Sequence, residues 1–432
     1  MNKNLIFLII FLFVCACSVD NKINIWSAKK NKNEINNDEI LFKDSEQFAS
    51  EFNTNIKLTL KDSYFKESFI NNYKNNNKIV NYSGNFENRN KFSYTKIDNF
   101  YKVHSDLIIT KKNEIIYFDG RGNIIKLDKN LKLVWTKNFY NKKEKKTNLS
   151  LSFAANENIL IVVDNLSYYY AINILSGDII WKKKNNAAFN SQVKVLNNKF
   201  YTLDFDNVLW CYSAIDGSKI WNYKSDNTFI KSVKKMSLVI DDNKLIFINS
   251  VGDLNALDLE NGNLLWQVPT QSSSIIENSF SVIYSDLIMD DNALYLSNNQ
   301  GSFLAINSDT GAIRWSQNIN STTRSTIVKN LIFVVSSSGY LIIINKLNGE
   351  ILRSTNLKKN IKKYGEKVEN IGFIVAKDKI FLSLNNGYVL KVNISDGVSQ
   401  SIYNIGRENI SRPYVNQKKL IIATDKYVIS YN

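Results

Sequence analysis

The sequence predicts an all-β fold, an eight-bladed β-propeller built from four-stranded antiparallel blades. Three observations lead to this prediction. One motif recurs at intervals of roughly 40–50 residues, each copy consists of short apolar runs bounded by Gly and Asn turns, and one hairpin signal can be counted eight times. The chain has 432 residues, 44% of them hydrophobic. This length exceeds the about 250–300 residues of a usual single core, so an architecture that grows by repetition suits it.

The first residues form a secretory signal. Residues 1–16 contain one cation and an apolar run that is much shorter than the roughly 20 residues needed to span a bilayer. The run ends in Val14–Cys17, which resembles the bacterial lipoprotein box. We therefore expect cleavage before Cys17 and acylation of that cysteine, for instance with palmitate, which anchors a protein to the membrane without spanning it. In the lipoproteins that this box resembles, a residue such as Ser18 favours sorting to the outer membrane.

The next stretch predicts a tether. Residues 17–77 are rich in Asn and Lys and show no steady hydrophobic period, so we expect a tether with at most one short ordered piece. Residues 78–432 are assigned to the propeller.

The repeat is strongest in the middle of the chain. An Ala-x-Asp or Ala-x-Asn strand is followed by a Gly, and in the clear copies a Trp lies four residues after that Gly. The clear copies are Ala171–Trp181, Ala214–Trp221, Ala256–Trp266 and Ala305–Trp315, and the weaker ones are Leu127–Trp135, Ile344–Arg353 and Val392–Gly397.

A Trp at one point of each outer strand predicts contact between blades, because its large apolar face can pack on the neighbouring blade. Core packing explains such residues better than a cofactor box. The tryptophans expected to staple the blades are Trp135, Trp181, Trp221, Trp266 and Trp315.

The number of blades follows from the hairpin before the Ala-type strand. Eight such turns occur, and the chain stops just after the strand that follows the eighth. The last blade therefore lacks its outer strand, and because an open sheet edge is a liability, a segment before the first blade should supply it. Our candidate is Lys91–Ile97, with Ile23–Ser27 as the runner-up. The turns are Asp119–Gly122, Asn165–Ser167, Asp204–Asn207, Ser250–Asp253, Asn298–Gly301, Ser337–Gly339, Asn385–Gly387 and Thr424–Lys426.

Residues for metal or nucleophilic chemistry are sparse. The chain has one His, His104, and three Cys, so no zinc-type cluster can be built. With Cys17 acylated, Cys211 has no disulfide partner and is expected to be buried. The net charge of +15 would favour binding to an anionic partner surface, or it reflects a compositional bias of the proteome. We expect no nucleic-acid binding. The sequence thus predicts no enzyme, cofactor or metal.

The repeat resembles that of the pyrroloquinoline-quinone-type eight-bladed propellers. Together with the lipoprotein box, the chain resembles the BamB family of outer-membrane protein assembly factors. This resemblance implies a scaffold that faces the periplasm and binds the POTRA region of the barrel insertase BamA, other members of the assembly (BAM) complex and unfolded outer-membrane proteins. The alternatives are another membrane-anchored propeller scaffold and a quinone-dependent dehydrogenase. The resemblance implies that such a dehydrogenase often stacks a disulfide between adjacent cysteines on the quinone, and this sequence has no adjacent cysteine pair.

The resemblance also suggests where the insertase would bind. The family's contact loops correspond to residues 228–234 and 277–286, which keep few of the family's residues. The partner-binding candidates are Phe229, Ile230 and Lys231 in the first stretch and Phe280, Tyr284 and Asp286 in the second. Ordinary packing between blades is the competing interpretation of both.

Overall fold

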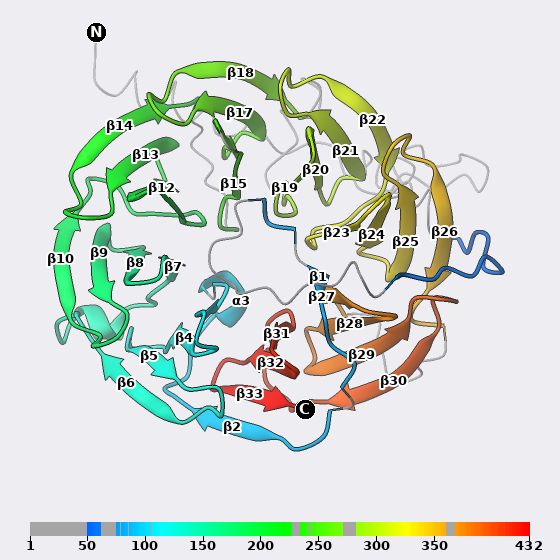
Figure 1. Ribbon diagram of the computed structural model, residues 1–432, viewed down its shortest axis with the longest axis horizontal. Helices are drawn as coiled ribbons and strands as arrows, with labels where there is room; N and C mark the ends of the chain where they lie inside the picture. The colour runs from blue at the N-terminus through cyan, green and yellow to red at the C-terminus, as the bar shows by residue number, and fades with distance from the viewer. Residues whose placement is uncertain are drawn as a thin grey trace, which may run out of the picture. The chain divides into compact units, whose positions relative to one another are not determined.

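The blades are eight sheets arranged in a ring in the computed structural model (Figure 1). The axis of the ring corresponds to the central channel of a propeller. The structure describes residues 50–61, 75–77, 79–84, 86–103, 105–226, 234–241, 243–270, 282–359 and 368–432. In the first seven blades the strands run outward to the rim in chain order, whereas in the eighth blade the rim strand comes first in the sequence. The predicted fold class and the number of blades are confirmed. Within the described ranges, no helix has the length and apolar character needed to cross a membrane.

The first four blades follow one another along the chain, and a short 3₁₀ helix, η2 (Glu144–Lys146), lies between the first two. Each blade begins at the channel and ends at the rim. Their strands are β3 (Ile108–Ile109), β4 (Ile115–Phe118), β5 (Ile124–Leu127) and β6 (Leu133–Lys137); β7 (Leu151–Ala155), β8 (Ile159–Asp164), β9 (Tyr168–Asn173) and β10 (Ile179–Lys184); β11 (Lys194–Leu196), β12 (Lys199–Leu203), β13 (Val208–Ser213) and β14 (Lys219–Lys224); and β15 (Leu238–Ile240), β16 (Lys244–Ile248), β17 (Asp253–Asp258) and β18 (Leu264–Pro269).

The last four blades continue the ring, and the eighth has three strands from the C-terminal part of the chain. Their strands are β19 (Ile288–Asp290), β20 (Ala293–Ser297), β21 (Ser302–Asn307) and β22 (Ile313–Asn318); β23 (Thr326–Val328), β24 (Leu331–Val335), β25 (Tyr340–Asn345) and β26 (Ile351–Asn356); β27 (Asn370–Ala376), β28 (Lys379–Leu384), β29 (Tyr388–Asn393) and β30 (Ser399–Asn404); and β31 (Tyr414–Asn416), β32 (Lys419–Ala423) and β33 (Tyr427–Tyr431).

The eighth blade is closed by a strand from the N-terminal side of the ring. β2 (Asn90–Ser93) pairs antiparallel with β33, with Phe92 opposite Val428. The predicted source of the closing strand, Lys91–Ile97, is therefore confirmed, although the strand itself ends at Ser93. Beyond it, the backbone nitrogens of Tyr94 and Ile97 still donate hydrogen bonds to Lys426 and Asp425. The runner-up, residues 23–27, lies outside the described residues.

The repeated Trp contacts the next blade through the repeated Gly. Gly349 has φ +77°, a conformation that favours glycine. A Cβ on Gly349 would lie 2.6 Å from Cδ2 of Trp315, which belongs to the preceding blade. The same relation holds for the pairs Trp135 with Gly177, Trp181 with Gly217, Trp221 with Gly262, and Trp266 with Gly311.

Most of these indoles also donate a hydrogen bond across the blade boundary. The Nε1 atoms of Trp135, Trp181, Trp266 and Trp315 lie 3.1 Å from the backbone oxygens of Ile174, Ala214, Ser308 and Lys346. Trp221 differs, because its buried Nε1 has no hydrogen-bond partner among the described residues. In the sixth blade Arg353 stands at the Trp position, is fully buried, and donates to the backbone oxygen of Ile394 in the seventh blade at 2.6 Å.

The described part of the predicted tether lies against the propeller. Near the rim, Phe52 forms an antiparallel bridge with Ser354 of β26. Closer to the axis, β1 (Ile79–Val80) pairs parallel with β27 and gives that sheet a fifth strand (Figure 1). The boundary predicted at residue 78 stays a prediction.

Two asparagines just before β1, Asn76 and Asn77, bond to the inner part of the ring. The Asn76 amide is buried and donates to the backbone oxygens of Leu238 at 3.1 Å and Leu287 at 2.9 Å. The Asn77 side chain exchanges two hydrogen bonds with the backbone of Ile327. This segment therefore ties the fourth, fifth and sixth blades together from inside the channel.

Candidate functional site

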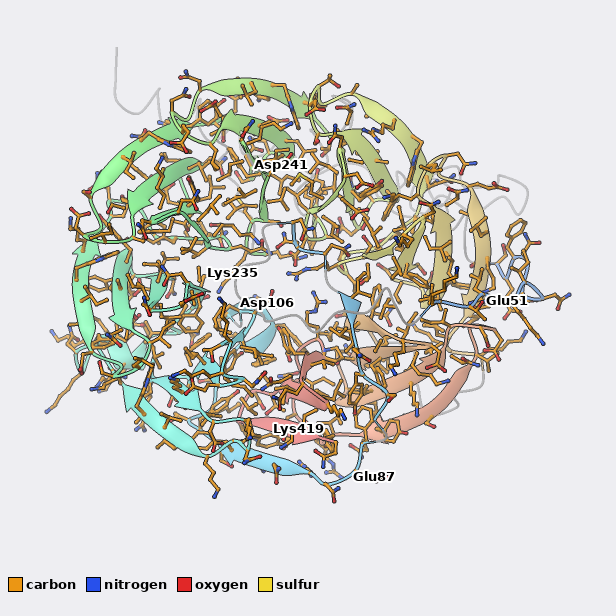
Figure 2. The ribbon with its side chains drawn as sticks, viewed as in Figure 1. Glu51, Glu87, Asp106, Lys235, Asp241 and Lys419 are labelled. Atoms are coloured by element: carbon orange, nitrogen blue, oxygen red, sulfur yellow. The ribbon has the colours of Figure 1, made fainter. Side chains whose placement is uncertain are left out.

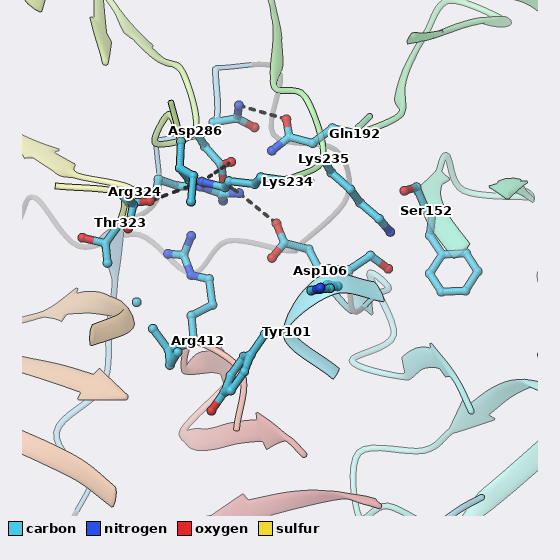
Figure 3. Close-up of a pocket in the computed structure, with 18 of the residues that line it drawn as sticks. Tyr101, Asp106, Ser152, Gln192, Lys234, Lys235, Asp286, Thr323, Arg324 and Arg412 are labelled. Carbon is cyan, nitrogen blue, oxygen red and sulfur yellow. Dashed lines mark hydrogen bonds and ion pairs between the residues drawn. The ribbon is translucent and has the colours of Figure 1, made fainter. Parts of the chain in front are cut away.

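A cavity with a volume of about 430 Å³ lies among the inner ends of the blades (Figure 3). Its lining residues lie mostly just before or at the start of an inner strand, and all eight blades contribute. α3 (Phe100–Val103), a single turn before β3, adds Tyr101 and Lys102 to the wall. Figure 2 shows Asp106 and Lys235 near the axis of the ring, whereas Lys419 lies farther out.

One arginine connects two carboxylates across the cavity. Arg324, just before β23, bonds to Asp286 through Nε at 2.7 Å and also through Nη2. The same Nη2 lies 3.0 Å from Oδ2 of Asp106, and the Tyr414 hydroxyl donates to the other oxygen of Asp106 at 2.7 Å. The network joins the first, fifth, sixth and eighth blades at the axis.

The pKa values in this network follow from burial and charge together. Burial alone would raise the pKa of Asp286, but the charges of Arg324 and Lys234 outweigh it and lower that pKa to about 2. Arg324 and Arg412 likewise hold the pKa of Asp106 well below its usual range despite its burial. Both carboxylates are therefore ionised at neutral pH, where Asp286 pairs with Arg324.

Three lysines enter the cavity from the third and fourth blades. Lys194 donates to the Asn76 side chain at 2.5 Å, and Lys235 donates to the backbone oxygen of Leu151 at 2.9 Å. Burial lowers the pKa of Lys194 and of Lys235 to about 7. Lys234 donates to the backbone oxygen of Tyr284 at 2.7 Å and pairs with Asp286 at 3.6 Å.

The lowered pKa values of Lys194 and Lys235 predict that the free energy of unfolding increases with pH. Because the folded-state pKa of Lys235 is below its unfolded value, the unfolded chain binds more protons between about pH 7 and pH 10, and each such lysine adds up to about 1.4 kcal/mol of stability per pH unit. We expect the free energy of unfolding, measured with urea at pH 7 and pH 9, to increase with pH and to increase less in Lys235→Met. Lys419→Met is the control, since Lys419 bonds to Asn130 at the surface. An identical pH dependence in both variants would contradict the burial effect.

The structure describes two of the predicted partner-binding residues, Tyr284 and Asp286. Asp286 lies in the cavity wall, and Tyr284 lies two residues earlier, where its hydroxyl accepts a hydrogen bond from Thr270 at 3.0 Å. Phe229, Ile230, Lys231 and Phe280 lie outside the described residues, as do Cys17 and His104. Cys211 is buried, as the sequence analysis expected.

Sequence reasoning missed most of the cavity. Asp106, Arg324, Arg412 and Lys235 were not singled out, because a charged residue in a loop is usually solvated. A positional signal exists, however. Asp106, Asp286, Arg324 and Arg412 each lie two residues before an inner strand, so aligning the repeats on their inner strands would have placed all four at the axis.

The cavity does not fit the calcium site of a quinone-dependent enzyme. Calcium takes six to eight oxygen ligands, but no group of three His, Cys, Asp or Glu suited to a metal occurs in the part of the chain that the structure describes. Asp106 and Asp286 are moreover paired with Arg324. We therefore derive no chemistry through a metal or a quinone here.

The ring and its Trp and Gly repeat define the chain as an eight-bladed β-propeller with pyrroloquinoline-quinone-type repeats. A family model described as outer membrane protein assembly factor BamB matches residues 120–355. Because the match covers more than half of the chain, the chain belongs to this family. A search among curated proteins found no match.

Solved structures share the fold at low sequence identity. BamB from Moraxella catarrhalis aligns with a TM-score of 0.62 and 15% identity, over 79% of this chain and 100% of that chain. A europium-containing methanol dehydrogenase aligns with a TM-score of 0.63 and 10% identity, over 80% and 86% of the two chains. Quinohemoprotein alcohol dehydrogenase from Comamonas testosteroni aligns with a TM-score of 0.60 and 10% identity, over 82% and 78%. These likenesses show the fold alone.

Proposed function

We propose that this chain is a non-enzymatic scaffold lipoprotein of the outer-membrane β-barrel assembly complex that assists the insertion of outer-membrane proteins. The observation that carries the proposal is membership of the family described as outer membrane protein assembly factor BamB. The fold suits a scaffold, because a propeller presents many loops on a rigid ring and exposed strand edges to which extended peptides can add.

We place the proposed contact with the POTRA region of a BamA-type insertase in residues 228–234 and 277–286. Contacts at the described ends of the two stretches support a single patch. Lys234, at the end of the first stretch, bonds to Tyr284 and pairs with Asp286, both in the second. We therefore expect a substitution in one stretch to change how much the other stretch contributes to binding.

A second candidate is suggested by the two dehydrogenases that share the fold. Reduction of a dye by the purified protein with added quinone and calcium would favour an enzyme. We expect no turnover above that of the heat-denatured chain, because Asp106 and Asp286 are engaged by Arg324. Co-purification of the native protein with a β-barrel insertase from detergent-solubilised outer membranes would favour the scaffold.

We also propose that the protein is anchored to the outer membrane through Cys17 and faces the periplasm. Cys17→Ala should leave an unprocessed or soluble form, because the acyl chains supply the attachment. Cys15→Ala is the matched control and should fractionate as the parent does. The measurement is membrane fractionation with mass determination of the mature N-terminus. Normal outer-membrane fractionation of Cys17→Ala would rule out this anchor.

A further inference from the structure

The wall of the channel cavity carries more positive than negative side chains. The apolar residues Ile108, Phe153 and Ile283 also line it. Its volume of about 430 Å³ falls in the range of roughly 300–1,000 Å³ that is usual for small-molecule sites. The cationic side chains in the wall are Lys102, Lys194, Lys234, Lys235, Arg324 and Arg412, and the carboxylates are Asp106, Asp286 and Glu369.

The two aspartates of the cavity bond mainly to residues other than Arg412. Arg324 bonds to Asp286 and Asp106, and Asp106 also accepts the hydrogen bond of Tyr414. Asp286 has Lys234 as a further partner. Two of the three carboxylates are thus engaged mainly by groups other than Arg412.

Arg412 reaches into the cavity from the start of the eighth blade (Figure 3). Its Nη2 donates to the backbone oxygen of Phe373 at 3.2 Å. Its Nε and Nη1 are buried and have no hydrogen-bond partner among the described residues. Burial and the nearby charge of Arg324 lower the pKa of Arg412. A buried guanidinium with unused donors is costly unless an anion or water satisfies it.

Lys235 offers a second set of donors in the same cavity. Its one hydrogen bond among the described residues goes to the backbone oxygen of Leu151. In its protonated form the Lys235 side chain has three donors, so two remain for a ligand. Lys235 and Arg412 belong to loops that precede the fourth and the eighth blades, so a bound molecule would be held from two sides of the ring.

We propose that this cavity binds a small organic oxyanion, a molecule with carboxylate or phosphate groups, with Arg412 as the principal binding residue and Lys235 as the second. The apolar wall residues would cover the carbon skeleton of the ligand. The proposal rests on the cavity alone and does not depend on the scaffold function.

The test is isothermal titration calorimetry on the full chain in detergent, with citrate as the carboxylate probe and inorganic phosphate as the phosphate probe. Sodium chloride at matched ionic strength is the control for general screening. We expect saturable binding of at least one probe, and the tighter of the two identifies the oxyanion class. Arg412→Gln should weaken that binding at least tenfold, as expected for the loss of a charge-assisted hydrogen bond.

Two further variants keep the test decisive. Lys235→Gln should weaken binding severalfold, and it stands in for Arg412→Gln if the latter fails to fold by circular dichroism. Lys419→Gln removes a lysine of the eighth blade outside the cavity and should bind as the parent does. The absence of saturable binding of either probe in the parent, unchanged affinity in Lys235→Gln, or an equal loss in Lys419→Gln would overturn the proposal.

Discussion

Deletion of residues 91–97 should unfold the last blade and lower the stability of the whole ring severely. The deletion removes most of β2 and exposes the edge of β33, with the loss of several ladder hydrogen bonds worth about 1 kcal/mol each. It also removes Ile97, which is 1% exposed, and with it about 2 kcal/mol of burial. A loss on the order of 5 kcal/mol approaches the entire stability of many domains.

A matched control separates closure from the general effect of shortening the chain. Deletion of residues 50–56 removes the same number of residues, and its described contacts with β26 are the bridge between Phe52 and Ser354 and the hydrogen bond from Arg353 to the Ile56 oxygen. Thermal unfolding followed by circular dichroism should show a much lower midpoint for the first deletion than for the second. If the chain without residues 91–97 unfolds at the same temperature as the parent, β2 does not hold the ring closed.

Replacement of a repeated Trp should weaken one blade boundary. Trp266→Ala removes the contact with Gly311 and the hydrogen bond to Ser308, and we expect a loss of about 3 kcal/mol. Trp266→Phe keeps most of the apolar surface but leaves the Ser308 oxygen without that donor, so a loss of about 1 kcal/mol is expected. The free energy of unfolding in urea measures both losses.

Trp221 provides the control for the hydrogen bond. It packs on Gly262 in the same way, but its Nε1 has no partner among the described residues. Trp221→Phe should therefore cost less than Trp266→Phe. Equal losses would show that the indole hydrogen bond adds no stability. A loss well under 1 kcal/mol for Trp266→Ala would show that this Trp does not hold the neighbouring blades together.

The ring could be predicted because each blade repeats the same local signals. A turn such as Ser337–Gly339 between two apolar runs identifies a hairpin without knowledge of tertiary contacts, and the count of such turns gave the number of blades. The missing strand could be predicted as well, because a sheet cannot leave the edge of β33 open. Its C-terminal limit could not, because Tyr94 and Ile97 continue the backbone contacts without a regular strand.

The interior of the channel could not be predicted. Asn75–Asn77 belong to a polar run that is typical of a tether, and only the folded ring supplies the backbone oxygens of Leu238 and Leu287 that Asn76 binds. The Arg324 network depends in the same way on residues from blades that are far apart in the sequence. Charged residues before a strand carry no local signal that distinguishes an axial position from a solvated loop.

Binding to the purified POTRA region of a BamA-type insertase tests the proposed function most directly. In a pull-down with the intact chain we expect a stable complex, which Lys231→Glu should weaken by about 1–3 kcal/mol if that lysine is a desolvated interface charge. Lys183→Glu, the same charge reversal on the exposed face of β10, should leave the complex unchanged. Non-additive losses on combining Lys231→Glu with Phe280→Ala would indicate one patch. Absence of binding by the intact protein would contradict the assembly-factor function.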